Sequence, residues 1–455
     1  MIFIPRDYQS AIIRHIMEHR RCAIWASMGA GKSASTLTAL EVLDLIENVY
    51  PALVIAPLRV ATSVWSDEAA KWTSLRHLRV SPIVGNVQER LHALQQRAEI
   101  YTINYESLPW LVEHLGEDWG FPTVIADEST KLKGFRLRQG TQRARALGTV
   151  AHIKVERFIE LTGTPAPNGL ADLWGQIHFL DAGQRLGRTH SGFTERWFRP
   201  SHDGYGLEPL PHAQREIQGK LRVICITISA SDYMDLPPLI ENTLLVDLPS
   251  AARQIYRAME KEMFAQIGAH DVEAFNAAAK TNKCLQLANG AAYVDVAGTF
   301  EEVHQAKLDA LEDIIEEAAG APVLVAYQFK SDLARILKRF KAARHLDKNP
   351  QTLRDWNAGM IPLLCAHPAS AGHGLSLHYG GNILAYFSSG WNLEDDMQIL
   401  ERIGPTRQAQ AGLNREVYVH RIVARDTVDE LVAERRAGKK SVQEILLDYM
   451  KRMPA

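Results

Sequence analysis

Short runs of apolar residues alternate with amphipathic segments near both ends of the chain. Five early runs have the length and continuous apolar character of strands buried on both faces, and they occupy residues 22–26, 52–58, 99–104, 123–128 and 159–165. Segments between them, such as 32–47 and 86–97, have the apolar spacing of helices. Four similar runs follow at 322–328, 361–366, 382–387 and 415–420. Because strands that alternate with helices form parallel sheets covered on both faces, we expect an α/β fold with two lobes.

The middle of the chain has a different pattern. Residues 181–236 are richer in Gly, Arg and aromatic residues, which indicates a basic and aromatic protrusion followed by a linker. From residue 250 to 292 the pattern is alanine-rich and helical, so we interpret 237–303 as a helical insertion that opens the second half. The first lobe is then expected at 1–180, and the second lobe, with a C-terminal brace helix, at 304–455.

The composition is that of an ordinary globular protein. The 455 residues are 46% apolar and 23% charged, and 51 Lys and Arg against 53 Asp and Glu leave a net charge of −2. These values exclude a disordered or collagen-like chain and a uniformly basic nucleic-acid coat, but they allow a local basic patch. The four cysteines lack zinc-ligand spacing, so reduced core thiols are expected. No signal-peptide pattern and no apolar run of ~20 residues is present, which indicates a cytoplasmic protein.

A glycine-rich loop joins the first expected strand to a helix, and it consists of Met28, Gly29, Ala30, Gly31, Lys32 and Ser33. Such a loop lets backbone N–H groups approach phosphate oxygens at a helix N-terminus. Lys32 would neutralise the β- and γ-phosphates of a nucleotide, and Ser33 would ligate Mg²⁺. Ala26 stands where the phosphate-loop pattern has its first glycine, so the loop taken alone also fits an ordinary strand-to-helix turn.

Two carboxylates, Asp127 and Glu128, follow the apolar run that begins at residue 123. Ligands of open parallel sheets bind at the carboxyl ends of the strands. Asp127 is therefore placed to hold hydrated Mg²⁺, and Glu128 to orient and deprotonate an attacking water. Two acids can also simply be solvated at a strand end, but the phosphate loop favours the catalytic interpretation. The expected cofactors are ATP and Mg²⁺.

The stretch after the acid pair is basic although the whole chain is not. Eight cations against the single acid Glu156 lie between residues 131 and 157, namely Lys131, Lys133, Arg136, Arg138, Arg143, Arg145, Lys154 and Arg157. A local excess of this kind suits contacts to nucleic-acid phosphates, although a solvated charged face has the same composition. Arginines also alternate with Trp197 and Phe198, which fits either a DNA-facing surface or a packed core.

Ten sequence elements occur in one order along nearly the whole chain: 5–9 (PRDYQ), 28–33 (MGAGKS), 53–58 (LVIAPL), 102–106 (TINYE), 127–130 (DEST), 161–165 (LTGTP) with Asn168, 327–333 (YQFKSDL), 370–375 (SAGHGL), 391–392 (WN) and 398–402 (QILER). In this order they resemble the ATPase core of superfamily-two, DEAD/DEAH-box-like helicases. The resemblance is closest to the Swi/Snf-type DNA-dependent translocases and their compact phage and prophage members.

This resemblance implies two RecA-like P-loop lobes with helical insertions between them and ATP bound between the lobes. It implies that Gln9 reads the adenine edge and that Arg6 and Gly374 belong to the nucleotide site. Thr162 and Thr164 would couple hydrolysis to lobe movement. The DNA path would include the basic stretch from Lys131 to Arg138, and Trp391 would contact DNA or the lobe interface.

The closing element of the family implies that Arg402 is an arginine finger, which stabilises transition-state charge. The family has a second arginine three residues later, where this chain has Pro405. Either Arg407 supplies the second contact from a wider loop, or only one finger exists and Arg407 pairs with an acid of its own lobe.

The resulting hypothesis is a monomeric motor that hydrolyses Mg²⁺·ATP while it moves along DNA, duplex DNA being favoured. A strand-separating helicase on single-stranded DNA or RNA, or an ATP-binding DNA clamp without turnover, would be encoded by similar elements. Replication or recombination proteins of a phage or its host are the expected protein partners, and no membrane contact is expected.

Overall fold

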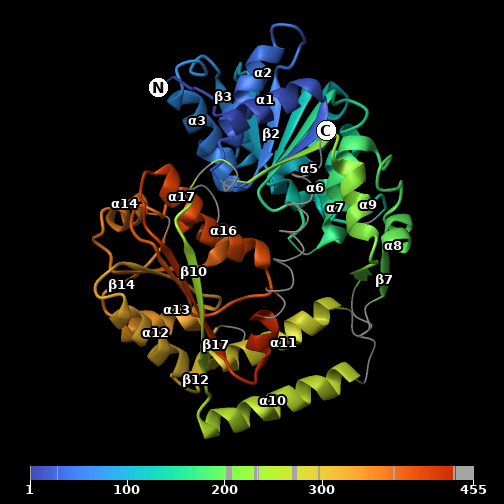
Figure 1. The fold of residues 1–455 in the computed structure, drawn as a ribbon. Coiled ribbons are helices and arrows are strands. Elements are labelled where there is room, and N and C mark those ends of the chain that lie inside the picture. Colours follow the sequence, from blue (N-terminus) through green and yellow to red (C-terminus); the bar gives the residue numbers. More distant parts are fainter. Residues whose placement is uncertain are drawn as a thin grey trace. The chain divides into compact units, whose positions relative to one another are not determined.

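A computed structural model of the chain describes residues 2–433 and 436, apart from 28, 139, 168, 201–206, 230–232, 234, 269–273, 296–297, 348 and 372–374. For the remaining residues of 261–281 it describes the backbone alone. Two compact units divide the chain, the first within Met1–Met234 and the second within Asp235–Lys440 (Figure 1). Among the described helices, none has the length and apolar character that a membrane span requires.

The first unit is built on a parallel sheet of seven strands. In spatial order the strands are β3 (Val80–Ile83), β4 (Ile100–Asn104), β2 (Ala52–Ala56), β5 (Thr123–Asp127), β6 (Arg157–Thr162), β1 (Arg21–Ala26) and β9 (Cys225–Ile228). Every neighbouring pair in this order is parallel. The carboxyl ends of β5, β6 and β1 therefore lie side by side at one edge of the sheet.

Helices cover both faces of this sheet because alternate strand residues point to opposite sides. One face packs on α1 (Asp7–Glu18), α2 (Lys32–Leu43) and α3 (Trp65–Lys71). The other packs on α4 (Val87–Gln95), α5 (Leu108–Leu115), α6 (Gln142–Val150), α7 (Leu173–Asp181), α8 (His190–Trp197) and α9 (Ala213–Leu221). In β2, for example, Val54 enters the first core while Leu53 and Ile55 enter the second. A short antiparallel pair, β7 (Phe198–Pro200) and β8 (Leu207–Pro209), extends from α8.

The second unit contains a six-stranded parallel sheet. The strand order is β10 (Leu239–Val246), β17 (Val417–Ala424), β16 (Ile383–Tyr386), β13 (Val323–Ala326), β15 (Leu363–Ala366) and β14 (Ala343–His345). One core includes α12 (Ala306–Glu317) and α13 (Lys330–Arg339), and the other includes α14 (Pro350–Asn357), α15 (Pro368–Ala371) and α16 (Leu393–Ile403). A third cluster joins α10 (Ser250–Gly268) and α11 (Ala274–Asn289) to the end of β17. The strands β11 (Ala291–Tyr293) and β12 (Phe300–Glu302) form a small hairpin.

The expected two-sheet α/β fold is confirmed, and all nine apolar runs form strands. The two short antiparallel pairs were not predicted, and in the two large sheets four strands were missed: β3, β9, β10 and β14. Each is the outermost strand of its sheet. Edge strands have one covered flank, so they carry fewer apolar residues and a weaker pattern. Strand β10 lies in the segment expected to be a helical insertion, and β9 lies in the segment expected to be a protrusion and linker.

Candidate functional site

The phosphate loop leaves β1 and turns directly into α2. Gly29 and Gly31 have φ angles of 79° and 76°, in the left-handed region that glycine adopts without strain. Gly31 is the residue before the first turn of α2, which contains Lys32 and Ser33. The Lys32 Nζ donates to the carbonyls of Ala26 and Ser27 at 2.7 and 3.3 Å. The ammonium group thus lies over the loop whose N–H groups would cradle a phosphate.

Gln9 from α1 closes this loop from one side. Its Nε2 donates to the Ala30 carbonyl at 3.2 Å, and its Oε1 accepts from the Arg6 backbone N–H at 2.9 Å. A Cβ added at Gly31 would clash with the Gln9 Nε2. Gln9, which the resemblance assigns to the nucleotide site, therefore packs directly against the phosphate loop.

The acid pair lies at the end of β5, where Asp127 is the last strand residue and Glu128 has an unusual backbone conformation. Glu128 has φ 56° and ψ 55°, which is left-handed and uncommon for a residue with a side chain. Such a conformation costs about 1–3 kcal/mol and persists where surrounding groups enforce it. The Tyr105 hydroxyl donates to the Asp127 carbonyl at 2.9 Å and approaches the Glu128 carbonyl at 3.4 Å. Backbone strain of this kind at the edge of a parallel sheet makes this turn a candidate functional element.

The carboxylate of Asp127 is fixed from two sides. Its Oδ2 accepts from the Trp65 Nε1 at 3.0 Å, and its Oδ1 accepts from the Glu128 backbone N–H at 3.1 Å. Trp65 lies on α3 and is fully buried, and no sequence signal indicated its role because it is indistinguishable from a core tryptophan. Burial also raises the pKa of Tyr105 well above its usual value, with further contributions from nearby acids, so this hydroxyl remains a donor.

Thr162 and Thr164 lie between these two loops. Thr162 ends β6, the strand between β5 and β1, and it is fully buried. Its Oγ1 accepts from the Thr164 backbone N–H at 3.1 Å, which shapes the turn of the LTGTP element. We call the turn at Thr162–Thr164 the threonine turn and the turn at Asp127–Glu128 the acid turn. The phosphate loop and these two turns are consequently neighbours at one edge of the first sheet.

These residues fit a hydrated Mg²⁺ ion. The ion prefers oxygen ligands and usually keeps several waters, with one or two protein oxygens and substrate phosphates completing its shell. The hydroxyl of Ser33 and the carboxylate of Asp127 are such oxygens, on loops separated by a single strand. In the described part of the chain no group of three or more His, Cys, Asp or Glu side chains is arranged as a metal site. The pair therefore suits Mg²⁺ carried in with a nucleotide.

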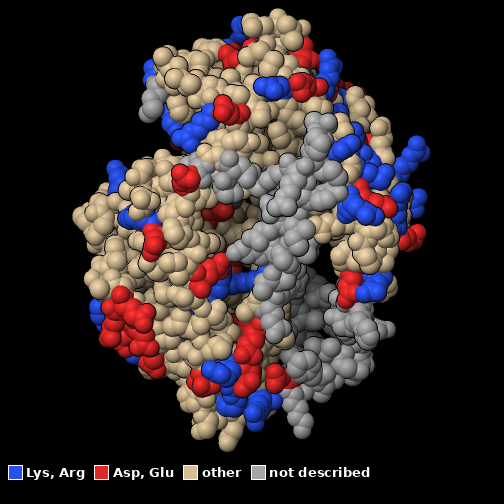
Figure 2. Space-filling view, viewed as in Figure 1, with Lys and Arg blue, Asp and Glu red and all other residues tan. Residues whose placement is uncertain are grey.

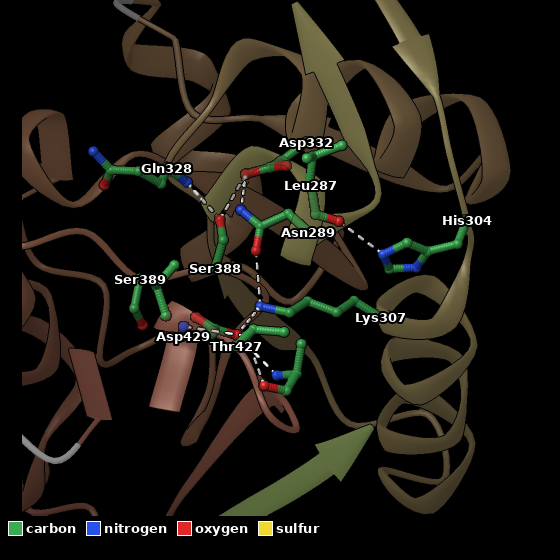
Figure 3. Close-up of polar contacts among 12 residues, drawn as sticks. Leu287, Asn289, His304, Lys307, Gln328, Asp332, Ser388, Ser389, Thr427 and Asp429 are labelled. Atoms are coloured by element: carbon green, nitrogen blue, oxygen red, sulfur yellow. Dashed lines mark hydrogen bonds and ion pairs between the residues drawn. The ribbon is translucent and has the colours of Figure 1, made fainter. Parts of the chain in front are cut away.

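A buried polar chain links the loops after three strands of the second unit (Figure 3). The Ser388 hydroxyl, after β16, accepts from the Gln328 backbone N–H, after β13, at 2.8 Å. The same hydroxyl donates to the Asp332 Oδ2 at 2.6 Å, and the Asn289 Nδ2 donates to this oxygen at 3.3 Å. Gln328 and Asp332 belong to the expected element 327–333, so this element is held by contacts outside itself.

Lys307 continues this chain to the segment after β17. Its Nζ donates to the Asn289 Oδ1 at 2.8 Å and to the Asp429 Oδ2 at 2.5 Å. Lys307 is fully buried and Asp429 is 3% exposed. A buried charge requires a partner of this kind, so the pair fixes α12 against the end of the sheet.

The two candidate finger arginines lie on successive helices of the second unit. Arg402 is in the last turn of α16 and is buried, and Arg407 is in α17 (Pro405–Gln410) and is half-buried. Pro405, which stands where the resemblance implies a second arginine, is the first residue of α17. Burial, and then the charges of Arg407 and Arg415, lowers the pKa of His378 to about 4.

Gln408 holds this pair of helices together and had no assigned role from the sequence. Its Nε2 donates to the carbonyls of Gly381 and Ile403 at 2.9 and 3.0 Å, and its Oε1 accepts from the Arg415 guanidinium at 2.9 and 3.1 Å. Trp391 is half-buried and packs against the cluster around α10 and α11. Met28, Asn168 and Gly374 lie outside the described residues.

The cationic side chains of the basic stretch differ in burial and in their contacts. Arg136 donates to the Lys133 and Phe135 carbonyls at 3.1 and 2.6 Å, so its guanidinium is engaged with the chain itself. Lys133 lies 3.9 Å from the Asp172 carboxylate. Arg157 is 3% exposed and cannot reach nucleic acid from this position. Lys131 is half-buried, and Arg138 is exposed.

The aromatic residues of the expected protrusion belong to the core. Trp197 and Phe198 are 1% and 6% exposed. Their neighbours Arg196 and Arg199 are exposed and lie 3.7 and 3.1 Å from glutamates. Figure 2 shows basic side chains gathered along the edge of the first unit that α8 and α9 form, and acidic side chains over α12 of the second unit.

Known proteins resemble this chain in sequence. The sequence matches the family described as SNF2-related domain over residues 10–290. It is 53% identical to protein p41 of Acyrthosiphon pisum secondary endosymbiont phage 1, over 99% of both chains. It is 23% identical to the transcription regulatory protein SNF2 of Saccharomyces cerevisiae, over 96% of this chain and 27% of that protein.

Two further proteins have lower sequence identity to this chain. The chain is 21% identical to a DNA repair and recombination protein RAD54-like of Gallus gallus, over 96% of this chain and 65% of that protein. Among solved structures, the Sulfolobus solfataricus SWI2/SNF2 ATPase core in complex with dsDNA is similar, with 21% identity, a TM-score of 0.44, and coverage of 98% of this chain and 93% of that one. The chain thus spans nearly all of the phage relative but only part of the yeast and chicken proteins.

Proposed function

The chain belongs to the SNF2-related domain family, and from this premise we propose that it is an ATP-driven DNA translocase. Hydrolysis of Mg²⁺·ATP would be stimulated by duplex DNA and would drive stepping along it. The observation that carries this proposal is the edge of the first sheet. There the phosphate loop after β1, the threonine turn after β6 and the strained acid turn after β5 are neighbours.

In this proposal the first unit binds and hydrolyses the nucleotide. Lys32 neutralises the β- and γ-phosphates at the N-terminus of α2. Gln9 donates to the loop and is proposed to bind the adenine edge. Ser33 and Asp127 would hold Mg²⁺, which would neutralise the charge that develops on the phosphates. Glu128 orients the water for in-line attack and accepts its proton. The Tyr105 hydroxyl contacts the backbone carbonyls of Asp127 and Glu128 and so fixes the backbone of this left-handed turn.

The second unit contains the two proposed finger arginines. Arg402 and Arg407 are proposed to stabilise transition-state charge, a role worth about 10³–10⁵ in rate in related nucleotide hydrolases. Gly404 and Pro405 turn the chain between their helices, and Gln408 fixes that turn. DNA phosphates are proposed to contact Lys131, Lys133, Arg136 and Arg138, with Arg138 the most accessible, and Trp391 is proposed to lie near the DNA path.

A steady-state ATPase assay with duplex DNA, single-stranded DNA, RNA or no nucleic acid tests the proposal. We expect turnover that rises most with duplex DNA. Greater stimulation by single strands would favour a strand-separating helicase, and binding without turnover would indicate a clamp. Glu128→Gln should lower turnover by ~10²–10⁴-fold while ATP still binds. Glu117→Gln, which changes an exposed acid elsewhere in the unit, is the matched control.

The DNA surface has its own control within the same basic stretch. Lys131→Ala combined with Arg138→Ala should raise the DNA concentration needed for half-maximal stimulation. It should also lower the salt slope of binding by ~0.9 for each DNA phosphate that the protein no longer neutralises. Lys154→Ala removes one positive charge of the same kind, but the Lys154 Nζ already donates to the Gly116 carbonyl and to Glu117. Equal effects of both changes would place the DNA path elsewhere.

A further inference from the structure

Helix α7 contains a buried amide among apolar neighbours. All nine of its residues are buried, and Gln176 is 1% exposed. A buried amide must find hydrogen-bond partners, because an unsatisfied polar group in the core costs about 1–3 kcal/mol. The partners of Gln176 therefore indicate why an amide occupies this position.

Gln176 joins the acid turn to the threonine turn. Its Oε1 accepts from the Ser129 hydroxyl at 3.0 Å, and Ser129 directly follows Glu128. Its Nε2 donates to the Pro165 carbonyl at 2.7 Å and to the Asp172 carbonyl at 3.0 Å. Pro165 ends the LTGTP element. A single side chain thus bonds the loop after β5 to the loop after β6.

The orientation of this amide is set by its surroundings. Both backbone carbonyls require a donor, so Nε2 must face them and Oε1 is left for the serine hydroxyl. The preceding residue, Gly175, brings α7 close to the acid turn. A Cβ at Gly175 would lie 2.5 Å from the Lys133 carbonyl oxygen and 2.8 Å from that of Leu132. The helix, the amide and the two loops therefore form one tightly packed unit.

We propose that Gln176 is a positioning residue that holds the Glu128 turn and the Thr162–Thr164 turn in a fixed relation. A displacement of either loop is then transmitted to the other, so the general base reaches its water only when the threonine turn is in place. This inference rests on the proposed ATPase activity. It adds a buried residue that acts through these two turns.

Gln176→Leu tests the role, because leucine keeps the volume but removes all three hydrogen bonds. We expect kcat at saturating DNA to fall about ten-fold, equivalent to about 1.4 kcal/mol of transition-state stabilisation, while KM for ATP changes less than about two-fold. Ser81→Ala is the control for a general loss of stability. It removes one buried hydrogen bond, from the Ser81 hydroxyl to the Ala93 carbonyl, at the far side of the same sheet.

Gln176→Glu adds a readout that a merely structural role would not change. A protonated carboxyl can donate to the Pro165 carbonyl, whereas a carboxylate cannot. Turnover of this variant relative to Gln176→Leu should therefore rise as the pH falls, and burial should place this change above the usual glutamate range. If Gln176→Leu does not fold, Ser129→Ala breaks the same bridge from its other end and should lower kcat several-fold.

Wild-type kcat in Gln176→Leu, or identical pH profiles of the Leu and Glu variants, would overturn the inference and leave the proposed function intact. A wild-type protein without turnover would instead refute the proposed function, and the inference with it.

Discussion

Glu160 is a buried acid in the middle of the first sheet. It is 0% exposed, and in the register of β6 it lies between Ala126 of β5 and Ala23 of β1. Within the described part of the chain, neither of its carboxyl oxygens has a hydrogen-bond partner. Burial, and then the nearby charge of Asp181, raises the pKa of Glu160 well above its usual value. Burial therefore favours the neutral form of this carboxyl group in the folded protein.

Glu160→Leu should stabilise the protein. An unpaired polar group in the core costs about 1–3 kcal/mol, and leucine fills a similar volume without that cost. The gain should also grow with pH. A raised pKa in the folded state means that the stability contribution of the acid is fully present below its unfolded pKa, near 4.5. Above that value the wild type loses about 1.4 kcal/mol per pH unit, relative to the variant, until the folded pKa is reached.

Thermal unfolding at several pH values between 5 and 8 measures both effects. For a unit of this size, each kcal/mol should move Tm by about 2–4 °C. Glu160→Gln serves as the control, because it keeps a polar side chain that does not titrate. Its stability should lack the pH dependence of the wild type, and it should gain less stability than Glu160→Leu. If Glu160→Leu is destabilised, or if all three proteins share one pH dependence, the carboxyl is bonded in solution and the reasoning fails.

Three further outcomes are expected. Gly31→Ala should weaken ATP binding at least ten-fold, measured by nucleotide titration, because a Cβ there clashes with the α1 glutamine and requires a strained φ. Lys307→Met should destabilise the second unit by about 3–5 kcal/mol in urea unfolding, because it leaves the buried Asp429 without its cation, and adding Asp429→Leu should restore most of the loss. Arg402→Ala and Arg407→Ala should both lower turnover with ATP affinity largely kept, and a fully active but destabilised Arg407→Ala would show that only one finger exists.

Much of the candidate site was predictable because its chemistry is local. The phosphate loop needs glycines at two left-handed positions, followed by a lysine and a hydroxyl in the first helical turn. These residues are adjacent in the sequence, so the pattern can be recognised there. Asp127 and Glu128 likewise follow an unmistakable buried strand. Trp65, Gln176 and Gln408 could not be predicted. A tryptophan or glutamine in an amphipathic helix has many possible roles, and only the partners brought from distant segments distinguish them.

The sequence by itself determined the two parallel sheets and the order of the motif loops, because buried central strands must be continuously apolar and the loops follow them. It did not determine the edge strands or which charges face solvent. The sequence does not distinguish the eight cations of the basic stretch, yet Arg157 is buried against Glu47 while Arg138 is exposed. Tertiary structure decided this, because a long cationic side chain turns inward wherever folding places a carboxylate or carbonyl within its reach, and such neighbours are not adjacent in sequence.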